Sequence, residues 1–97
     1  METDSWPFDQ PRNCAVFTTR EVMESEEPIL LVSHDVEDHA WQFIGSTHGN
    51  LDNAKIIALQ EAVELDPTVL ELSDLPVGWQ AVRQTRDDAW VRQRYSN

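Results

Sequence analysis

The sequence has few residues of several kinds on which common functions depend. It holds one cysteine, three glycines and seven Lys or Arg residues among 97, against eighteen Asp or Glu residues. The resulting net charge of −11 is unfavourable for binding nucleic acid or an anionic membrane surface, because clustered Lys and Arg normally bind both. We therefore expect neither as a partner. The charge favours a basic protein instead, since complementary fields steer association.

The single Cys14 cannot close a disulfide within the chain, so it suits a reducing compartment. Its apolar neighbours predict a buried thiol with no role as a nucleophile. No apolar run approaches the ~20 residues of a membrane-spanning helix, and the chain does not open with the basic and apolar regions of a secretion signal. The predicted location is the cytoplasm.

Glycines are too few and too scattered for a phosphate-binding loop, which leaves nucleotide binding without support. Ser33, His34 and Asp35 spell the letters of a catalytic triad, but neighbours in a strand point to opposite faces. Paired carboxylates are abundant in polar turns, where they are usually solvated. The sequence therefore predicts no catalytic residues and no cofactor.

The central stretch of the chain is residues 28–45, PILLVSHDVEDHAWQFIG, which predicts a β-hairpin. Its first arm is the branched apolar run at residues 29–33. In its second arm, Trp41 and Phe43 alternate with Gln42 and Ile44, which places the two aromatic rings on one face. The polar residues between the arms form the tip.

The rest of the chain predicts one small α+β domain at residues 14–97, preceded by an N-terminal arm at 1–13 that lacks periodicity. Residues 14–18 alternate as a strand, Thr19 can cap a short helix, and a main helix is predicted at about 53–65. Asp66 and Pro67 suit the start of a further helical turn. Residues 78–84 and 89–92 predict a second hairpin. The expected architecture is an antiparallel sheet of four or five strands packed by the one main helix, with short helical turns.

Three histidines could bring imidazoles to the hairpin tip and the following loop. His34 and His39 lie five residues apart with carboxylates between them, and His48 follows in a polar loop. Imidazole and carboxylate together can hold zinc or iron, but this spacing matches no standard zinc pattern. The alternative interpretation is a solvated acidic turn whose histidines bind no metal.

The acidic residues also define a predicted partner surface. Glu21 to Pro76 holds thirteen acidic residues and only one basic residue, Lys55. Within it, Ile57 falls on the polar side of the predicted main helix, where an exposed apolar side chain suits an interface. The candidate partner-binding residues are Asp35, Glu37, Asp38, Ile57, Glu61 and Glu64. The alternative is that these acidic residues only keep the protein soluble.

Aromatic residues supply a second candidate surface. Four Trp among 97 residues is a high count, and Trp fills cores as well as interfaces. We place Trp41 and Trp79 in the core, and assign Trp6, Phe8 and Trp90 to possible self-association. The chain is accordingly expected to be a monomer or a homodimer.

A family resemblance adds to these patterns. The succession CAVFTTREV, PILLV, AWQFIG and ELDPTVLELSDLPVGWQAVR, between Cys14 and about Arg83, resembles a bacterial family formerly described as a domain of unknown function. That family is now grouped with polymorphic-toxin immunity proteins as immunity group thirty-three. The resemblance implies a non-catalytic protein that binds and occludes a partner protein, and it implies no catalytic residues.

The leading hypothesis is thus an immunity-like protein-binding domain whose acidic surface binds a basic partner. Two alternatives come from other classes. One is a metal-binding protein or metal-dependent enzyme that uses His34, His39 and His48. The other is a self-associating domain of unknown function.

Overall fold

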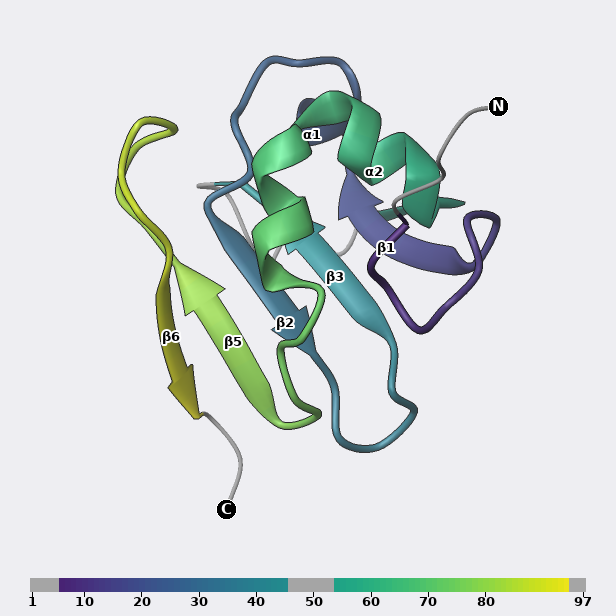
Figure 1. The fold of residues 1–97 in the computed structure, drawn as a ribbon. Helices are drawn as coiled ribbons and strands as arrows, with labels where there is room; N and C mark the ends of the chain where they lie inside the picture. Colours follow the sequence, from purple (N-terminus) through teal and green to yellow (C-terminus); the bar gives the residue numbers. More distant parts are fainter. Residues whose placement is uncertain (1–5, 46–53, 95–97) are drawn as a thin grey trace, which may run out of the picture.

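A computed structural model describes residues 6–45 and 54–94 of the chain. Within these residues, six strands form one mixed sheet in the order β4-β1-β3-β2-β5-β6, and helical segments α2 and η2 pack on one face of it (Figure 1). The class is α+β, as predicted, but the sheet has more strands than the four or five expected. The elements in chain order are β1 (Ala15–Thr19), α1 (Arg20–Met23), β2 (Leu31–His34), β3 (Trp41–Ile44), β4 (Ala54–Ala58), α2 (Leu59–Leu65), η2 (Pro67–Leu72), β5 (Trp79–Val82) and β6 (Val91–Arg94).

The predicted central hairpin is confirmed. β2 and β3 pair antiparallel with Leu31 opposite Ile44 and His34 opposite Trp41. Trp41 and Phe43 are 1% and 0% exposed, whereas Gln42 and Ile44, which alternate with them, are half-buried. The alternation read from the sequence therefore sets which face of β3 enters the core.

The sheet is mixed, not antiparallel throughout. β1 pairs antiparallel with β4 on one side and parallel with β3 on the other. α1, which Thr19 caps by accepting a hydrogen bond from the Val22 N–H, carries the chain away from the end of β1. The β2–β3 hairpin then returns so that β3, and not β2, lies against β1. Because β3 is the second arm of that hairpin, its direction matches that of β1.

The main helix predicted at about 53–65 is wrong in its first half. Ala54–Ala58 is strand β4, paired residue for residue with β1, and α2 begins only at Leu59. Two adjacent β-branched residues, Ile56 and Ile57, favour a strand, where one points into the core and the other outward. At the junction, Glu61 Oε1 accepts a hydrogen bond from the Ala58 N–H at 2.9 Å, which satisfies a donor at the start of α2.

The core lies between the sheet and the α2–η2 layer. Asp66 caps η2 by accepting hydrogen bonds from the backbone N–H and the hydroxyl of Thr68, as its position before Pro67 predicts. The buried apolar side chains are Phe8, Val16, Val22, Ile29, Val32, Trp41, Phe43, Ile57, Leu59, Ala62, Val69, Leu72, Leu75 and Ala81.

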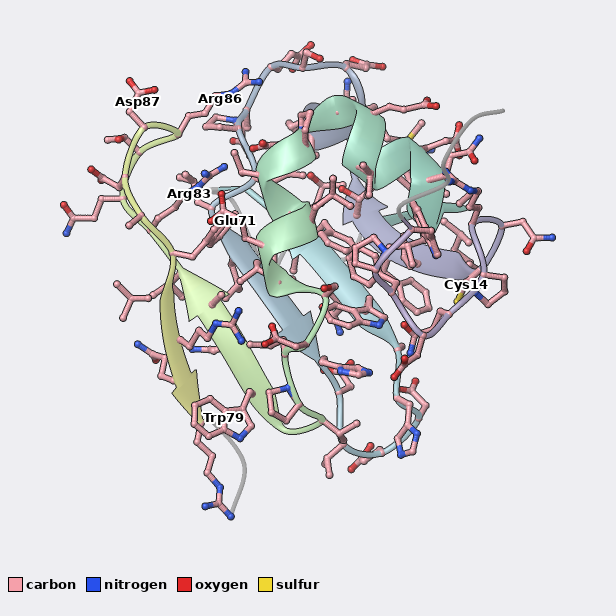
Figure 2. The ribbon with its side chains drawn as sticks, viewed as in Figure 1. Cys14, Glu71, Trp79, Arg83, Arg86 and Asp87 are labelled. Atoms are coloured by element: carbon pink, nitrogen blue, oxygen red, sulfur yellow. The ribbon has the colours of Figure 1, made fainter. Side chains whose placement is uncertain are left out.

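The second predicted hairpin is also confirmed, with β5 and β6 paired antiparallel and Val82 opposite Val91. Trp79, which we placed in the core, is only partly buried and packs against it. Figure 2 shows Trp79 at the end of β5 that is remote from the β5–β6 turn. Cys14 is half-buried at the start of β1, and not fully buried as expected.

Candidate functional site

The predicted partner-binding residues fall on two separate parts of the molecule. Asp35, Glu37 and Asp38 lie in the turn between β2 and β3, whereas Glu61 and Glu64 lie on α2. Figure 1 shows this turn at one end of the sheet and α2 at the other. The two groups of carboxylates therefore cannot contact one small partner segment together.

In the β2–β3 turn, two of the three carboxylates are used by the turn itself. Asp35 Oδ2 accepts a hydrogen bond from Gln42 Nε2 at 2.7 Å. Asp38 Oδ1 accepts one from the Ala40 N–H at 3.0 Å, next to His39 with its positive φ of 58°. These contacts stabilise the local backbone, as short polar side chains do in turns. Glu37 is exposed.

The histidines of the metal hypothesis are placed differently from one another. His34 is buried: its ring stacks on Trp41 at 4.1 Å, and its Nδ1 lies 2.8 Å from the carbonyl oxygen of Leu75. His39 is exposed in the turn, and His48 lies outside the described residues. In the part of the chain that the structure describes, no three His, Cys, Asp or Glu side chains gather closely enough to hold a metal ion. His34 links β2 to the segment after η2.

A groove lies between α1 and α2. It is lined by Met23, Ile57, Glu61, Glu64 and Leu65, with a volume of about 200 Å³. The three apolar side chains and the two carboxylates come from three different elements. Sequence reasoning placed Ile57 on the exposed face of a helix; instead it is 7% exposed in β4. The residue thus belongs to the candidate surface as part of the groove lining and not as a protruding anchor.

A second depression adjoins this groove at Leu65, which lines both. Its volume is about 210 Å³, and it lies between α1, the segment before β2 and the start of η2. Glu27, Asp66 and Arg86 supply its charged groups. Because Leu65 lines both, the two hollows are neighbours beside α1, and we call them together the α1–α2 furrow.

The α1 side of this furrow is acidic. Glu24 and Glu26 are exposed there, and Glu21 is half-buried. Arg20 pairs with two of these carboxylates, at 3.4 Å from Glu21 and 3.6 Å from Glu24. Both contacts lie at the surface, where ion pairs contribute little and are screened by salt. The two guanidinium groups of Arg20 and Arg86 are outnumbered by the carboxylates around the furrow, so this end of the molecule is negative.

Behind the furrow, Arg83 forms a buried guanidinium centre that the sequence did not reveal. Nε and Nη2 both donate to the carbonyl oxygen of Ile29, at 3.1 and 2.9 Å. Nη1 donates to Thr68 Oγ1 at 3.2 Å and to the Arg86 carbonyl at 3.1 Å, and Nη2 also donates to Asp66 Oδ2. Every N–H donor of the guanidinium is therefore used. Figure 2 shows Arg83 between η2 and the turn that carries Arg86 and Asp87.

The pKa of Asp66 reflects these contacts. Burial by itself raises the pKa, but hydrogen bonds from Thr68 and the charge and hydrogen bond of Arg83 outweigh it, so the pKa lies below the ordinary 3.8. The carboxylate is therefore ionised at neutral pH and pairs with Arg83. This ion pair fixes the rear wall of the furrow, because Asp66 lines the second depression.

The aromatic residues proposed for self-association are packed within the chain. Phe8 is 5% exposed and meets Trp41 edge to face at 5.3 Å. Trp6 packs on Phe8, donates its indole N–H to the Gln10 carbonyl at 2.7 Å and lies under the Arg12 guanidinium. Trp90 packs under the guanidinium of Arg83 at 4.0 Å. These side chains join the N-terminal arm and the β5–β6 connection to the body, so they offer little exposed ring surface.

Comparisons with protein-family models, with curated proteins and with solved structures found no match to this chain. In the described residues, no helix has both the length and the apolar composition needed to cross a bilayer. The furrow is thus argued from its own residues. Sequence reasoning identified Ile57, Glu61 and Glu64, but it missed Met23, Leu65 and Arg83, because nothing in the sequence brings α1 against α2.

Proposed function

We propose that this chain is a non-catalytic, immunity-like protein-binding domain, and that the α1–α2 furrow binds a basic segment of its partner protein. The observation that carries the proposal is the convergence of three apolar side chains and two carboxylates in one groove. The resemblance to immunity group thirty-three supports the same reading, as does the net charge of −11.

The groove has the chemistry of a site for a single Lys or Arg side chain. Such side chains lay their methylene stems along apolar surface and keep the charged head in a polar environment. Met23, which is 41% exposed, together with Ile57 and Leu65 offers that apolar surface. Glu61 and Glu64 are both exposed at the rim and can accept charge-assisted hydrogen bonds from the head.

The size of the groove also favours a protein side chain over a small molecule. Pockets for drug-sized ligands and cofactors usually enclose about 300–1,000 Å³. The groove measures about 200 Å³. One partner side chain fills it, and the acidic residues of α1 then lie beside the flanking partner residues.

The carboxylates are available for this contact. Glu61 uses Oε1 to cap α2, which leaves Oε2 at the rim. Glu64 forms no ion pair with any residue in the described ranges 6–45 and 54–94. Because both carboxylates are exposed at the rim, an ion pair with each contributes about 0.2–1 kcal/mol to the affinity, and their charge also speeds association.

The test compares two double variants that change the charge equally. Glu61→Gln/Glu64→Lys alters the groove, and the Gln side chain keeps an acceptor for the Ala58 N–H. Glu37→Lys/Asp38→Asn alters the β2–β3 turn by the same charge, and Asn keeps the acceptor for the Ala40 N–H. Each tagged protein is used for a pull-down from native lysate at low and moderate salt, read by mass spectrometry.

We expect the wild type and the turn variant to recover one basic protein in near-stoichiometric amount. The groove variant should recover it at least about tenfold less well, and salt should weaken the association of the wild type. Equal recovery by the two variants would show that the groove is not the binding site. Recovery of the bait alone by the wild type would contradict the proposed function itself.

A further inference from the structure

The face of the sheet opposite α2 and η2 has an unusual composition for this chain. Strand register determines which side chains share that face, and none of those within the six described strands is charged. Yet 26% of the whole sequence is charged, with a net charge of −11. An uncharged surface of this extent on so acidic a protein is typical of an interaction site.

Two rows of side chains cross this face. One row is apolar and runs through Ile44, Leu31, Val82 and Val91, which the register places side by side. Val91, at the β6 edge, is 56% exposed. The row is continuous across four strands, so it offers one apolar band and not isolated residues.

The neighbouring row is polar near the centre and apolar at one end. Gln42, Ser33, Gln80 and Gln93 lie side by side, and the Gln80 and Gln93 amides hydrogen-bond at 3.0 Å. Beyond Gln42 the same row continues to Phe17 and Ile56, which are 38% and 65% exposed. Large apolar side chains thus project from the β1–β4 half of the face.

The other half of the face is hollowed. A depression of about 550 Å³ lies over β2 and β5, with Leu31, Gln80 and Val82 among the residues that line it. The sheet therefore carries projecting side chains on β4 and β1 and a hollow on β2 and β5, on opposite sides of its midline. A two-fold axis along that midline, parallel to the strands, exchanges β1 with β5 and β4 with β6.

We propose that this face binds a second copy of the chain, sheet on sheet, about such an axis. Phe17 of one protomer then faces the hollow beside Gln80 of its partner, and the reverse contact follows by symmetry. Because this axis runs along the strands, each row of side chains faces the same row of the partner. The strand segments that meet carry no charged side chains on this face, and Asp35, whose carboxylate accepts a hydrogen bond from Gln42 just beyond β2, is the acidic residue next to the axis. This inference concerns a different surface from the α1–α2 furrow and does not depend on its function.

The area of the face sets the expected strength. Six strands spaced by about 4.8 Å, with about 3.3 Å per residue over four or five residues, give a flat area of roughly 400 Å² per protomer. Two such faces total about 800 Å², which is below the roughly 1,200–2,000 Å² of stable specific interfaces and within the range of weak, transient ones. We therefore expect a weak, reversible dimer that forms only at high protein concentration.

The test is sedimentation equilibrium of the full chain over a concentration series from micromolar to millimolar, at low and high salt. The wild type should pass from monomer to dimer, and high salt should leave the dimer equal or stronger because it screens repulsion between acidic chains. Ile56→Glu should weaken the dimer at least about tenfold, since it buries an unpaired charge. Val36→Glu is the matched control, because Val36 is 47% exposed in the β2–β3 turn, outside the six strands of this face, and the change should affect the dimer much less than Ile56→Glu.

A second pair of variants tests the axis itself. The proposed symmetry sets Ile56 opposite Gln93 of the partner. Ile56→Lys/Gln93→Glu should therefore dimerise more tightly than Ile56→Glu/Gln93→Glu, with circular dichroism to verify that both are folded. Monomeric wild type at every concentration would overturn the proposal, and so would a dimer that these changes at Ile56 do not weaken. Equal association of the two double variants would overturn the axis.

Discussion

Replacing Arg83 should destabilise the protein more than any other single change to a charged residue in the described structure. Its side chain is 1% exposed, and that of its partner Asp66 is 5% exposed. Arg83→Met removes the guanidinium and leaves the Asp66 carboxylate buried without its counter-ion. Breaking a buried ion pair in this way costs about 3–5 kcal/mol.

Further losses add to that cost. The Ile29 carbonyl loses both of its guanidinium donors, and Trp90 loses the cation that packs on its ring. An unsatisfied buried carbonyl costs about 1–3 kcal/mol. We expect Arg83→Met to lower the free energy of unfolding by about 4 kcal/mol or more, which is a large share of the ~5–15 kcal/mol of a small domain. For a chain of this length that corresponds to a fall in melting temperature of at least about 15 °C.

Urea unfolding followed by tryptophan fluorescence and circular dichroism measures this cost. Arg86→Met is the matched control, because Arg86 is exposed in the same turn and only its backbone carbonyl accepts from Arg83. Its cost should stay within about 0.5 kcal/mol. Arg83→Lys should fall between the two, since a lysine keeps the charge but has fewer donors and no planar fork. A cost below about 1 kcal/mol for Arg83→Met, or one equal to that of Arg86→Met, would refute the reasoning.

Two further predictions follow from the same region and from the β3 terminus. The pKa of Asp66 is lowered in the folded state, so the stability that its carboxylate contributes is present above the unfolded value near 3.8 and is lost as the pH falls through the folded value. Between pH 5 and 2, the free energy of unfolding measured in urea should fall less for Asp66→Asn than for the wild type. The same fall for both proteins would contradict this assignment. A β-carbon at Gly45 would collide with the Glu27 side chain and lie 3.0 Å from the Pro28 carbonyl oxygen. Gly45→Ala should therefore lower the free energy of unfolding by about 1–3 kcal/mol. A loss under about 0.5 kcal/mol in urea unfolding would show that the segment at Glu27 and Pro28 moves aside at little cost.

The hairpins could be predicted because their signals are local. Alternation at Trp41 to Ile44 and the turn-forming residues at 85–88 each lie within a few positions of the strands they join. The caps at Thr19 and Asp66 were equally readable, since a short polar side chain and a following proline act on the next few residues only. In each case the interaction that decides the structure is close in sequence.

The segment 54–65 could not be predicted in this way. Its apolar residues fit a helical period, and only pairing with β1 makes the first half a strand. The parallel contact of β1 with β3 also depends on residues far apart in the chain. Local propensity does not include such contacts, so tertiary structure overrides it.

The sequence by itself determined the α+β class, two hairpins, two helix caps and the net negative charge, because these depend on composition and on near neighbours. The tertiary structure alone decided that Ile57 joins Glu61 and Glu64 in a groove with Met23, and that the acidic turn at Asp35 lies apart from them. It also decided that Arg83 is buried among Ile29, Thr68 and Asp66. Each of these arrangements brings together residues from separate elements, and the physical reason is the packing of α1, α2 and η2 against one sheet.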